Sequence, residues 1–303
     1  MAPSSTFFTQ TPQWHWLIII YFFVGGLAGG CYFLAALIDL VGRPSDRPLA
    51  RLGYYVAFPA IALSGLLLTV DLGRPERFWH MLIQSHTLRP MVKLYSPMSF
   101  GSWGLLAFGG FALLAFLAAL AEDGRLRWGG LLRVRPRGVL GTLVGIVGGM
   151  LGLFIASYTG VLLTVTNRPM WSDTTLLGLV FAISAGSTSA ALLLLLARGR
   201  DHTGGVAALE RFDMMALALE PIAIAALIAS LGSVARIWLS VWGGLLLLVV
   251  VLGMLLPLAL QWRARTRHAY SPAAAALLVL IGGFLFRAVI VLSSDAVRLS
   301  WRA

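Results

Sequence analysis

The sequence predicts an all-α integral membrane protein, a bundle of eight transmembrane helices. Hydrophobic residues make up 59% of the chain, charged residues make up 12%, and the mean hydropathy is +0.87, which is more apolar surface than a soluble core encloses. Apolar runs of about 20 residues, the length that crosses a hydrocarbon layer as a helix, recur along the chain. These runs lack the alternation of barrel strands, and helices satisfy their own backbone hydrogen bonds in lipid.

The expected spans follow one another along the whole chain. They are residues 16–38, 54–70, 100–120, 139–165, 176–197, 214–234, 241–260 and 273–292. The first and fifth spans both contain a small-residue patch, an apolar run and then Gly-Arg. This echo favours a single membrane domain of two four-helix halves, residues 1–165 and 174–303, although low-complexity membrane sequence also produces such echoes.

Basic residues between the spans predict the orientation. Connections after the first, third, fifth and seventh spans carry fourteen arginines, and the opposite side carries eight arginines or lysines. Because cytoplasmic loops are enriched in these residues, we expect the fourteen inside and both termini outside. Topology and contact with anionic lipid headgroups then account for the net charge of +11, and nucleic acid is not an expected partner.

Cysteine and histidine placement argues against metal centres in this chain. The single cysteine, Cys31, excludes an intrachain disulfide or a cysteine-ligated cluster. A haem in a helical bundle needs axial histidines within facing helices. All histidines fall at or beyond the ends of spans, so no haem or other metal site is expected; they are His15, His80, His86, His202 and His268.

The longest connection, residues 71–99, mixes charges, aromatic residues and three prolines. A merely connecting loop needs neither this length nor exposed aromatic residues, so we expect a docking surface for another subunit. The alternative is an interfacial hairpin whose aromatic rings lie at headgroup level. The residues expected to dock the partner are Arg74, Glu76, Arg77, Phe78 and Trp79.

Two phenols and one carboxylate are expected at similar depth near the outer face. Tyr21 lies seven residues after Trp14 and Tyr158 lies seven before Val165, so each phenol is about 10 Å below the surface. Asp71 ends the second span on the same side. Hydrogen-bonding groups, a titratable group and an apolar surround suit a quinone. His15 is a further candidate, although it points roughly 120° away from Tyr21 on one helix.

Glycines of the first span permit two interpretations. They either open a slot for the isoprenoid tail of a quinone or let neighbouring helices pack closely, as in GxxxG pairs. The glycines concerned are Gly25, Gly26, Gly29 and Gly30.

Ionisable residues within spans are costly and are therefore functional candidates. Glu220 lies in the sixth span, and Arg287 lies about 21 Å in from the inner face, too deep to reach it by snorkelling. Asp39 closes the first span on the inner side. These three residues are candidates for proton transfer; the alternative is a set of paired charges that fixes helix register.

Several segments carry a family resemblance. They are WHW followed by GGLAGG in the first span, DLGRPERFW at 71–79, SPMSFGSW at 96–103, YTGVLLTVTNRPMW at 158–171, SAGSTSAA in the fifth span and LIGGFLFR at 280–287. In this order they resemble the NrfD/PsrC family, the membrane subunits of polysulfide reductase-like complexes, over nearly the whole chain.

The resemblance implies an anchor subunit of a respiratory oxidoreductase in a bacterial or archaeal cytoplasmic membrane, not catalytic alone. It implies bound menaquinone or ubiquinone, no haem, and docking to a four-cluster iron-sulfur subunit joined to a molybdopterin catalytic subunit. Iron-sulfur clusters and the molybdenum cofactor then belong to the partners only. The family's quinone-contacting tyrosine falls on Tyr158, and its acidic residue falls on Asp71.

One departure from the family pattern concerns the quinone site. In the polysulfide reductase subunit, the positions that match Ile18 and Tyr21 carry an asparagine and a histidine that help to hold the quinone. Ile18 cannot replace the asparagine, so a structural anchor without an active quinone site is one alternative. A secondary transporter is another, favoured by Glu220, Arg287 and the internal echo, and it predicts helices broken at mid-membrane near Pro221 and Pro257.

Overall fold

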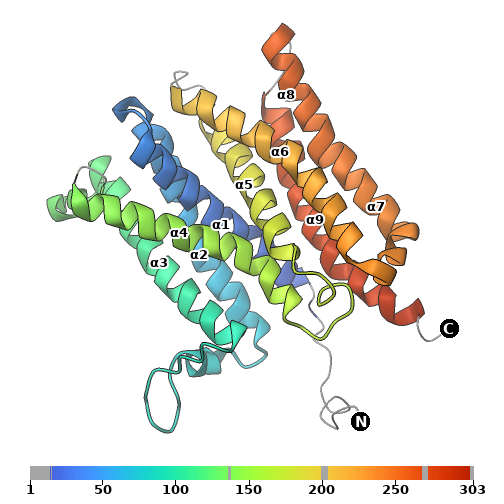
Figure 1. Ribbon diagram of the computed structural model, residues 1–303. Helices are drawn as coiled ribbons and strands as arrows, with labels where there is room; N and C mark the ends of the chain where they lie inside the picture. Colours follow the sequence, from blue (N-terminus) through green and yellow to red (C-terminus); the bar gives the residue numbers. More distant parts are fainter. Residues whose placement is uncertain (1–13, 15, 136–137, 199–203, 268–271, 301–303) are drawn as a thin grey trace.

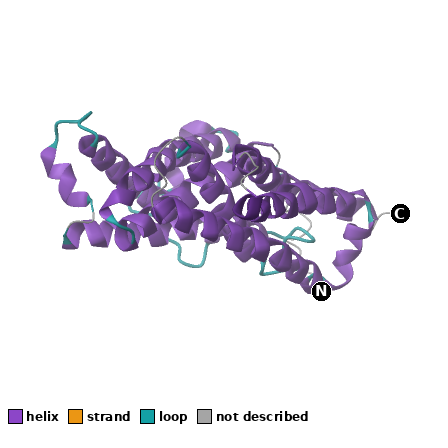
Figure 2. Ribbon diagram, turned by 90° about the horizontal axis from the view of Figure 1, so that it is seen from above, coloured by secondary structure: helices purple, strands orange, loops and turns teal. Residues whose placement is uncertain are grey.

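A computed structural model describes residues 14, 16–135, 138–198, 204–267 and 272–300 (Figure 1). Figure 2 shows helices joined by loops in these ranges, and the one β interaction recorded among them is an isolated bridge between Ile83 and Pro90. Eight helical segments of the described chain are long and apolar enough to cross a membrane. The predicted class, an all-α multi-pass membrane protein, is confirmed.

The spans are formed by nine named helices and one π-helical segment within the described residues. They are α1 Trp16–Val41, α2 Arg47–Asp71, α3 Pro97–Glu122, α4 Val139–Thr164, α5 Leu177–Leu196, α6 Gly204–Ser230, α7 Val241–Val250, η6 Val251–Leu255, α8 Leu256–Arg267 and α9 Pro272–Ser300. Short 3-10 helices lie in the connections: η2 Pro44–Asp46, η3 Pro75–Met81, η4 Gly129–Val134 and η5 Gly232–Leu239.

Two helices begin earlier than predicted. We expected the second and sixth spans from residues 54 and 214, but α2 begins at Arg47 and α6 at Gly204. Charged residues lie near both starts, Arg47 and Arg51 in α2 and Glu210, Arg211 and Asp213 in α6, so a search for apolar runs placed these starts in loops. The α6 start is stabilised by the buried carboxylate of Asp46, whose Oδ1 accepts a hydrogen bond from the Gly205 N–H at 2.9 Å.

The predicted seventh span is one continuous helical segment whose middle is irregular. It consists of α7, the π-helical η6 and α8. Within η6, Gly253 lies directly against the backbone of Gly282 in α9, and a Cβ at either position would overlap the other glycine. The eighth span, α9, continues to Ser300, well past the predicted end at residue 292.

Helix α1 is central and is packed through its small residues. It contacts α2, α4, α5 and α9. Gly29 meets the Gly152 backbone of α4, while Gly30 meets Ser189 and the Ala185 carbonyl of α5, with no room for a side chain at either glycine. For Gly29 and Gly30 the close-packing interpretation is therefore confirmed and the open slot is wrong.

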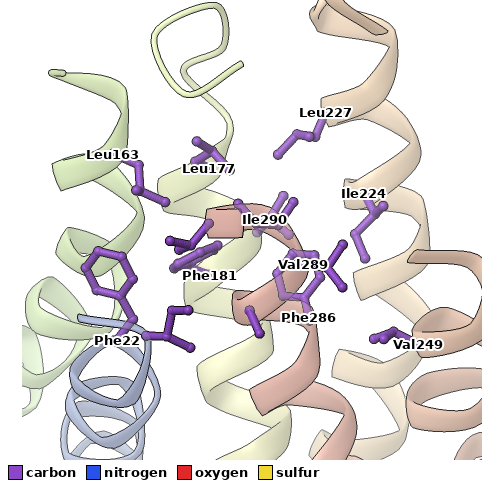
Figure 3. Close-up of a cluster of buried hydrophobic side chains, with 14 of the residues drawn as sticks. Phe22, Leu163, Leu177, Phe181, Ile224, Leu227, Val249, Phe286, Val289 and Ile290 are labelled. Atoms are coloured by element: carbon purple, nitrogen blue, oxygen red, sulfur yellow. The ribbon is translucent and has the colours of Figure 1, made fainter. Parts of the chain in front are cut away.

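The bundle has two ends that differ in their connections (Figure 1). The loop end carries residues 72–96, 165–176 and 231–240 together with the start of α1, and the arginine end carries residues 42–46 and 123–135. Apolar side chains from α1, α4, α5, α6, α7 and α9 meet in one buried cluster that extends through the bundle to the loop end, and part of it is shown in Figure 3. This cluster supports the first candidate site.

Candidate functional site

Tyr158 is fixed at the loop end by α3. Its hydroxyl donates a hydrogen bond to the Pro97 carbonyl at 2.7 Å, and its ring stacks on Phe154 with centroids 5.3 Å apart. Gly101 lies beneath the ring, and a Cβ there would overlap the phenol. Only 7% of Tyr158 is exposed. The phenol is thus held at the start of α3.

The structure brings Tyr21 to Tyr158 and leaves Asp71 at the rim. Tyr21 is fully buried in the same cluster as Tyr158. Leu67 of α2 packs against that cluster. Asp71, the exposed last residue of α2, lies one helical turn beyond Leu67 and hence on the same helix face. Ile18 contributes an apolar wall to the cluster.

His15 lies outside the described residues. The Asp71 carboxylate is accessible to solvent at the end of α2, whereas both phenols are in an apolar surround.

A segment after α4 seals this end of the bundle, and no role was assigned to it from composition alone. Trp171, fully buried, donates from Nε1 to the Ile290 carbonyl of α9 at 3.2 Å and stacks on Trp14 with centroids 5.3 Å apart. Arg168 lies over the Trp171 ring at 4.8 Å and forms an ion pair with Asp295. The TNRPMW motif therefore joins α1 to α9.

The residues predicted to dock a partner are grouped on η3. All five are exposed, including 50% of Phe78 and 36% of Trp79. Arg77 and Glu76 form an exposed ion pair at 4.0 Å. A protruding turn with accessible aromatic and charged side chains is a typical composition for a protein interface.

Arg287 occupies the middle of the bundle and is fully buried. Its Nη1 donates to the Gly283 carbonyl at 2.8 Å and to Ser184 Oγ at 3.2 Å, and its guanidinium lies over the rings of Phe23 and Phe181 at 5.7 and 5.3 Å. Carbonyl, hydroxyl and aromatic groups thus replace water around the cation.

Glu220 belongs to the same polar interior but forms no ion pair with Arg287 within 4.0 Å among the described contacts. Its Oε2 accepts a hydrogen bond from Ser187 Oγ at 3.2 Å. Asp213, which the sequence reasoning missed, lies two turns earlier on α6, is fully buried, and accepts from Gln261 Nε2 at 2.7 Å. The missed signal was the spacing of seven residues, which places both acids on one helix face.

Asp39 belongs to a separate cluster at the arginine end. Arg135 binds it through both terminal guanidinium nitrogens, Nη1 at 2.6 Å and Nη2 at 3.2 Å, and donates from Nε to Glu122 at 2.9 Å. The Arg135 guanidinium also lies 5.0 Å from the centre of the Tyr54 ring. A cavity of about 10 Å³ beside Arg135 is lined by Tyr32 and Tyr54 and has room for about one water.

Comparison with known proteins agrees with this arrangement. Residues 4–297 match the family model described as Polysulphide reductase, NrfD. The sequence is 28% identical to a polysulfide reductase chain of Wolinella succinogenes over 283 residues, covering 82% of this protein and 85% of the relative. It is 28% identical to protein NrfD of Escherichia coli, covering 64% and 63%.

A third relative, a selenate reductase subunit of Mesobacillus selenatarsenatis, is 29% identical over 114 residues, 38% of this protein and 24% of the relative. Its name, like that of the Wolinella protein, is that of one subunit of a reductase. The family model spans all eight candidate membrane helices. The chain therefore belongs to the NrfD polysulphide reductase family.

Proposed function

We propose that the chain is the quinone-reactive membrane subunit of a respiratory oxidoreductase, with a menaquinone or ubiquinone head group bound beside Tyr158 and Tyr21. This proposal rests on the placement of Tyr158. Its nearly buried phenol is held at the loop end by a hydrogen bond to the Pro97 carbonyl at the start of α3, and the exposed Asp71 ends α2 at the same end of the bundle. The reductase subunits among the relatives support the same class of function.

The residues present suit the reduced form of the ligand. Because the Tyr158 hydroxyl already donates to Pro97, its oxygen remains free to accept a hydrogen bond from a quinol hydroxyl. Phe154 and Ile18 supply apolar walls for the ring. Asp71 takes up the two released protons one after the other and passes each to water at the loop end. When bound, a quinol supplies a pair of electrons and a pair of protons.

The electrons pass to a partner subunit. A single cysteine cannot hold an iron-sulfur cluster, so we place the clusters on a four-cluster ferredoxin-like subunit seated over residues 71–99, and the molybdopterin centre on a third subunit. The exposed rings of Phe78 and Trp79 form the apolar centre of that contact, and the charges of η3 form its rim. The loop end then faces outward from a bacterial or archaeal cytoplasmic membrane.

Conservative substitutions in the intact complex test the site. Tyr158→Phe removes the oxygen that accepts from the quinol and should weaken quinol affinity about tenfold. Asp71→Asn should slow quinol turnover more than affinity, because it removes the proton acceptor. Tyr55→Phe and Asp123→Asn, a phenol and a carboxylate at the arginine end, are matched controls that should leave both quantities unchanged. Unchanged affinity and turnover in Tyr158→Phe and Asp71→Asn would overturn the proposal.

The structure offers the transporter alternative little support. Helix α6 runs unbroken through Pro221 from Gly204 to Ser230, and α8 begins before Pro257 without an unwound segment. The irregularity near Pro257 is the π-helical η6, which remains helical, so the described helices show no unwound break of the kind that this alternative predicts. Purification separates the two functions, because an anchor is recovered with the iron-sulfur absorbance of its partner and a carrier is recovered alone.

A further inference from the structure

The second half of the bundle contains buried polar atoms that the proposed quinone site does not use. Besides Trp238 Nε1 in η5, three side-chain oxygens and one nitrogen on α6, α8 and α9 have no hydrogen-bond partner among the described residues. They are Asp213 Oδ1, Glu220 Oε1, Gln261 Oε1 and Arg287 Nε. Buried polar groups in membrane helices are costly unless they are satisfied, so this convergence on α6, α8 and α9 indicates ordered water or exchangeable protons.

Helix α6 aligns these groups along its axis. Asp213, Leu217 and Glu220 are spaced four and three residues apart, lie on one face and are all buried. The two carboxylates are therefore about 10 Å apart along the helix. Pro221 has no N–H, so the Leu217 carbonyl lacks the donor that a helix normally provides four residues later. An acceptor for water thus lies between the two acids.

The irregular seventh span turns Gln261 toward Asp213. The π-helical segment η6 inserts an extra residue, which rotates everything after it by about 100° relative to a regular helix. Gln261, within α8, then donates from Nε2 to Asp213 Oδ2 at 2.7 Å. Because α8 continues to the arginine end and Gln261 is only half-buried, its amide is the group through which Asp213 can be reached from that end.

Among the polar groups along α6, Glu220 lies farther from the arginine end than Asp213 does, in the same polar interior as the Arg287 guanidinium. Ser187 donates to Glu220, and Ser184 of the same helix accepts from Arg287. Backbone carbonyls hold the guanidinium in place, so it stabilises a negative charge on Glu220 without neutralising it through direct contact. The other charged groups on elements packed against α6 are Asp46 in η2, Arg236 in η5 and three arginines of α8, namely Arg263, Arg265 and Arg267; Glu210 and Arg211 lie on α6 itself.

We propose that Asp213 and Glu220 are the two proton-holding groups of a hydrated path along α6. Water at the Leu217 carbonyl joins them, and protons enter from the arginine end past Gln261. In each transfer, the Asp213 carboxyl gives its proton to this water, and the water gives a proton to the Glu220 carboxylate; no electron is moved. The path does not depend on the quinone site.

Infrared spectroscopy of the full chain, purified with its associated subunits, tests this path. Over a series of pH values, subtracting spectra of Asp213→Asn and Glu220→Gln from the wild-type spectrum should isolate one protonated-carboxyl band for each acid. The Asp213 band should persist to a higher pH than the Glu220 band, and both bands should shift in D₂O. Pro221→Ala gives the Leu217 carbonyl a helical donor while keeping both acids. It should slow the D₂O shift of the Glu220 band about tenfold. Pro59→Ala, the matching change inside α2, should not.

Gln261→Leu gives a second variant, expected to slow the exchange of both bands, with circular dichroism confirming retained helix. Absence of protonated-carboxyl bands, bands that respond to Na⁺ at fixed pH, or exchange in Pro221→Ala as fast as in Pro59→Ala would each overturn the path. None of these results depends on quinol turnover, so failure here and failure of the quinone site are distinguishable.

Discussion

Removing the Arg135 guanidinium is expected to destabilise the bundle by about 3–5 kcal/mol, the usual cost of breaking a buried ion pair from one side. The Arg135 side chain is 4% exposed, that of Asp39 is 0% exposed, and the two are joined by a bidentate contact. Arg135→Gln leaves the Asp39 carboxylate buried without its cation. Glu122, 16% exposed on its side chain, loses a partner but keeps access to water.

A matched surface pair sets the scale for this effect. Arg51 and Asp123 form an ion pair whose side chains are 22% and 25% exposed, so Arg51→Gln should cost no more than about 1 kcal/mol. Combining Arg135→Gln with Asp39→Asn removes both buried charges and should recover much of the lost stability. The measurement is the apparent free energy of unfolding in mixed detergent and SDS. Equal losses for Arg135→Gln and Arg51→Gln, or a double variant as unstable as the sum of the two single variants, would refute the reasoning.

Three further predictions concern packing and assembly. Gly101→Ala should displace the Tyr158 phenol and weaken quinol affinity about tenfold, measured by quenching of tryptophan fluorescence, whereas Gly109→Ala, which faces open space, should not. Gly282→Val should force α9 from η6 and cost about 1–3 kcal/mol in the same unfolding assay, with Gly244→Val, which also faces open space, as its control. Replacing both Phe78 and Trp79 with serine should release the iron-sulfur partner during purification without unfolding the helices.

The number and order of the helices were predictable because hydropathy and the lack of alternation depend only on local sequence. Helix ends were less predictable. The first turns of α6 contain Glu210, Arg211 and Asp213, and such residues resemble a loop until the Asp46 cap and the Gln261 contact are known. The π-helical segment at Val251–Leu255 has no comparable signal, since it depends on how α7 and α8 pack against α9.

The partners of the candidate residues could not be predicted. Counting residues predicted that Tyr21 and Tyr158 lie at similar depth, and both belong to one extended buried cluster. Their partners are tertiary contacts: the Pro97 carbonyl that accepts from the Tyr158 hydroxyl belongs to a helix start 61 positions away. Arg135 was counted as a loop cation, although its side chain turns inward to Asp39. The direction in which an arginine side chain points at a helix boundary depends on which carboxylate is close enough to pair with it. The spacing of residues in the sequence does not reveal this.

The two halves of the bundle bury their charges at different depths, and this difference bears on function. In the first half the buried ion pair of Asp39 and Arg135 lies at the arginine end, where water and headgroups are near and anchoring alone explains it. In the second half, Glu220 and Arg287 lie deep in the bundle and are supported by the buried hydroxyls of α5. Neither docking at η3 nor a quinol at the loop end requires charges at that depth. Because apolar residues of similar volume would be less costly there, exchange of protons along α6 is the simplest reason for acidic groups in that position.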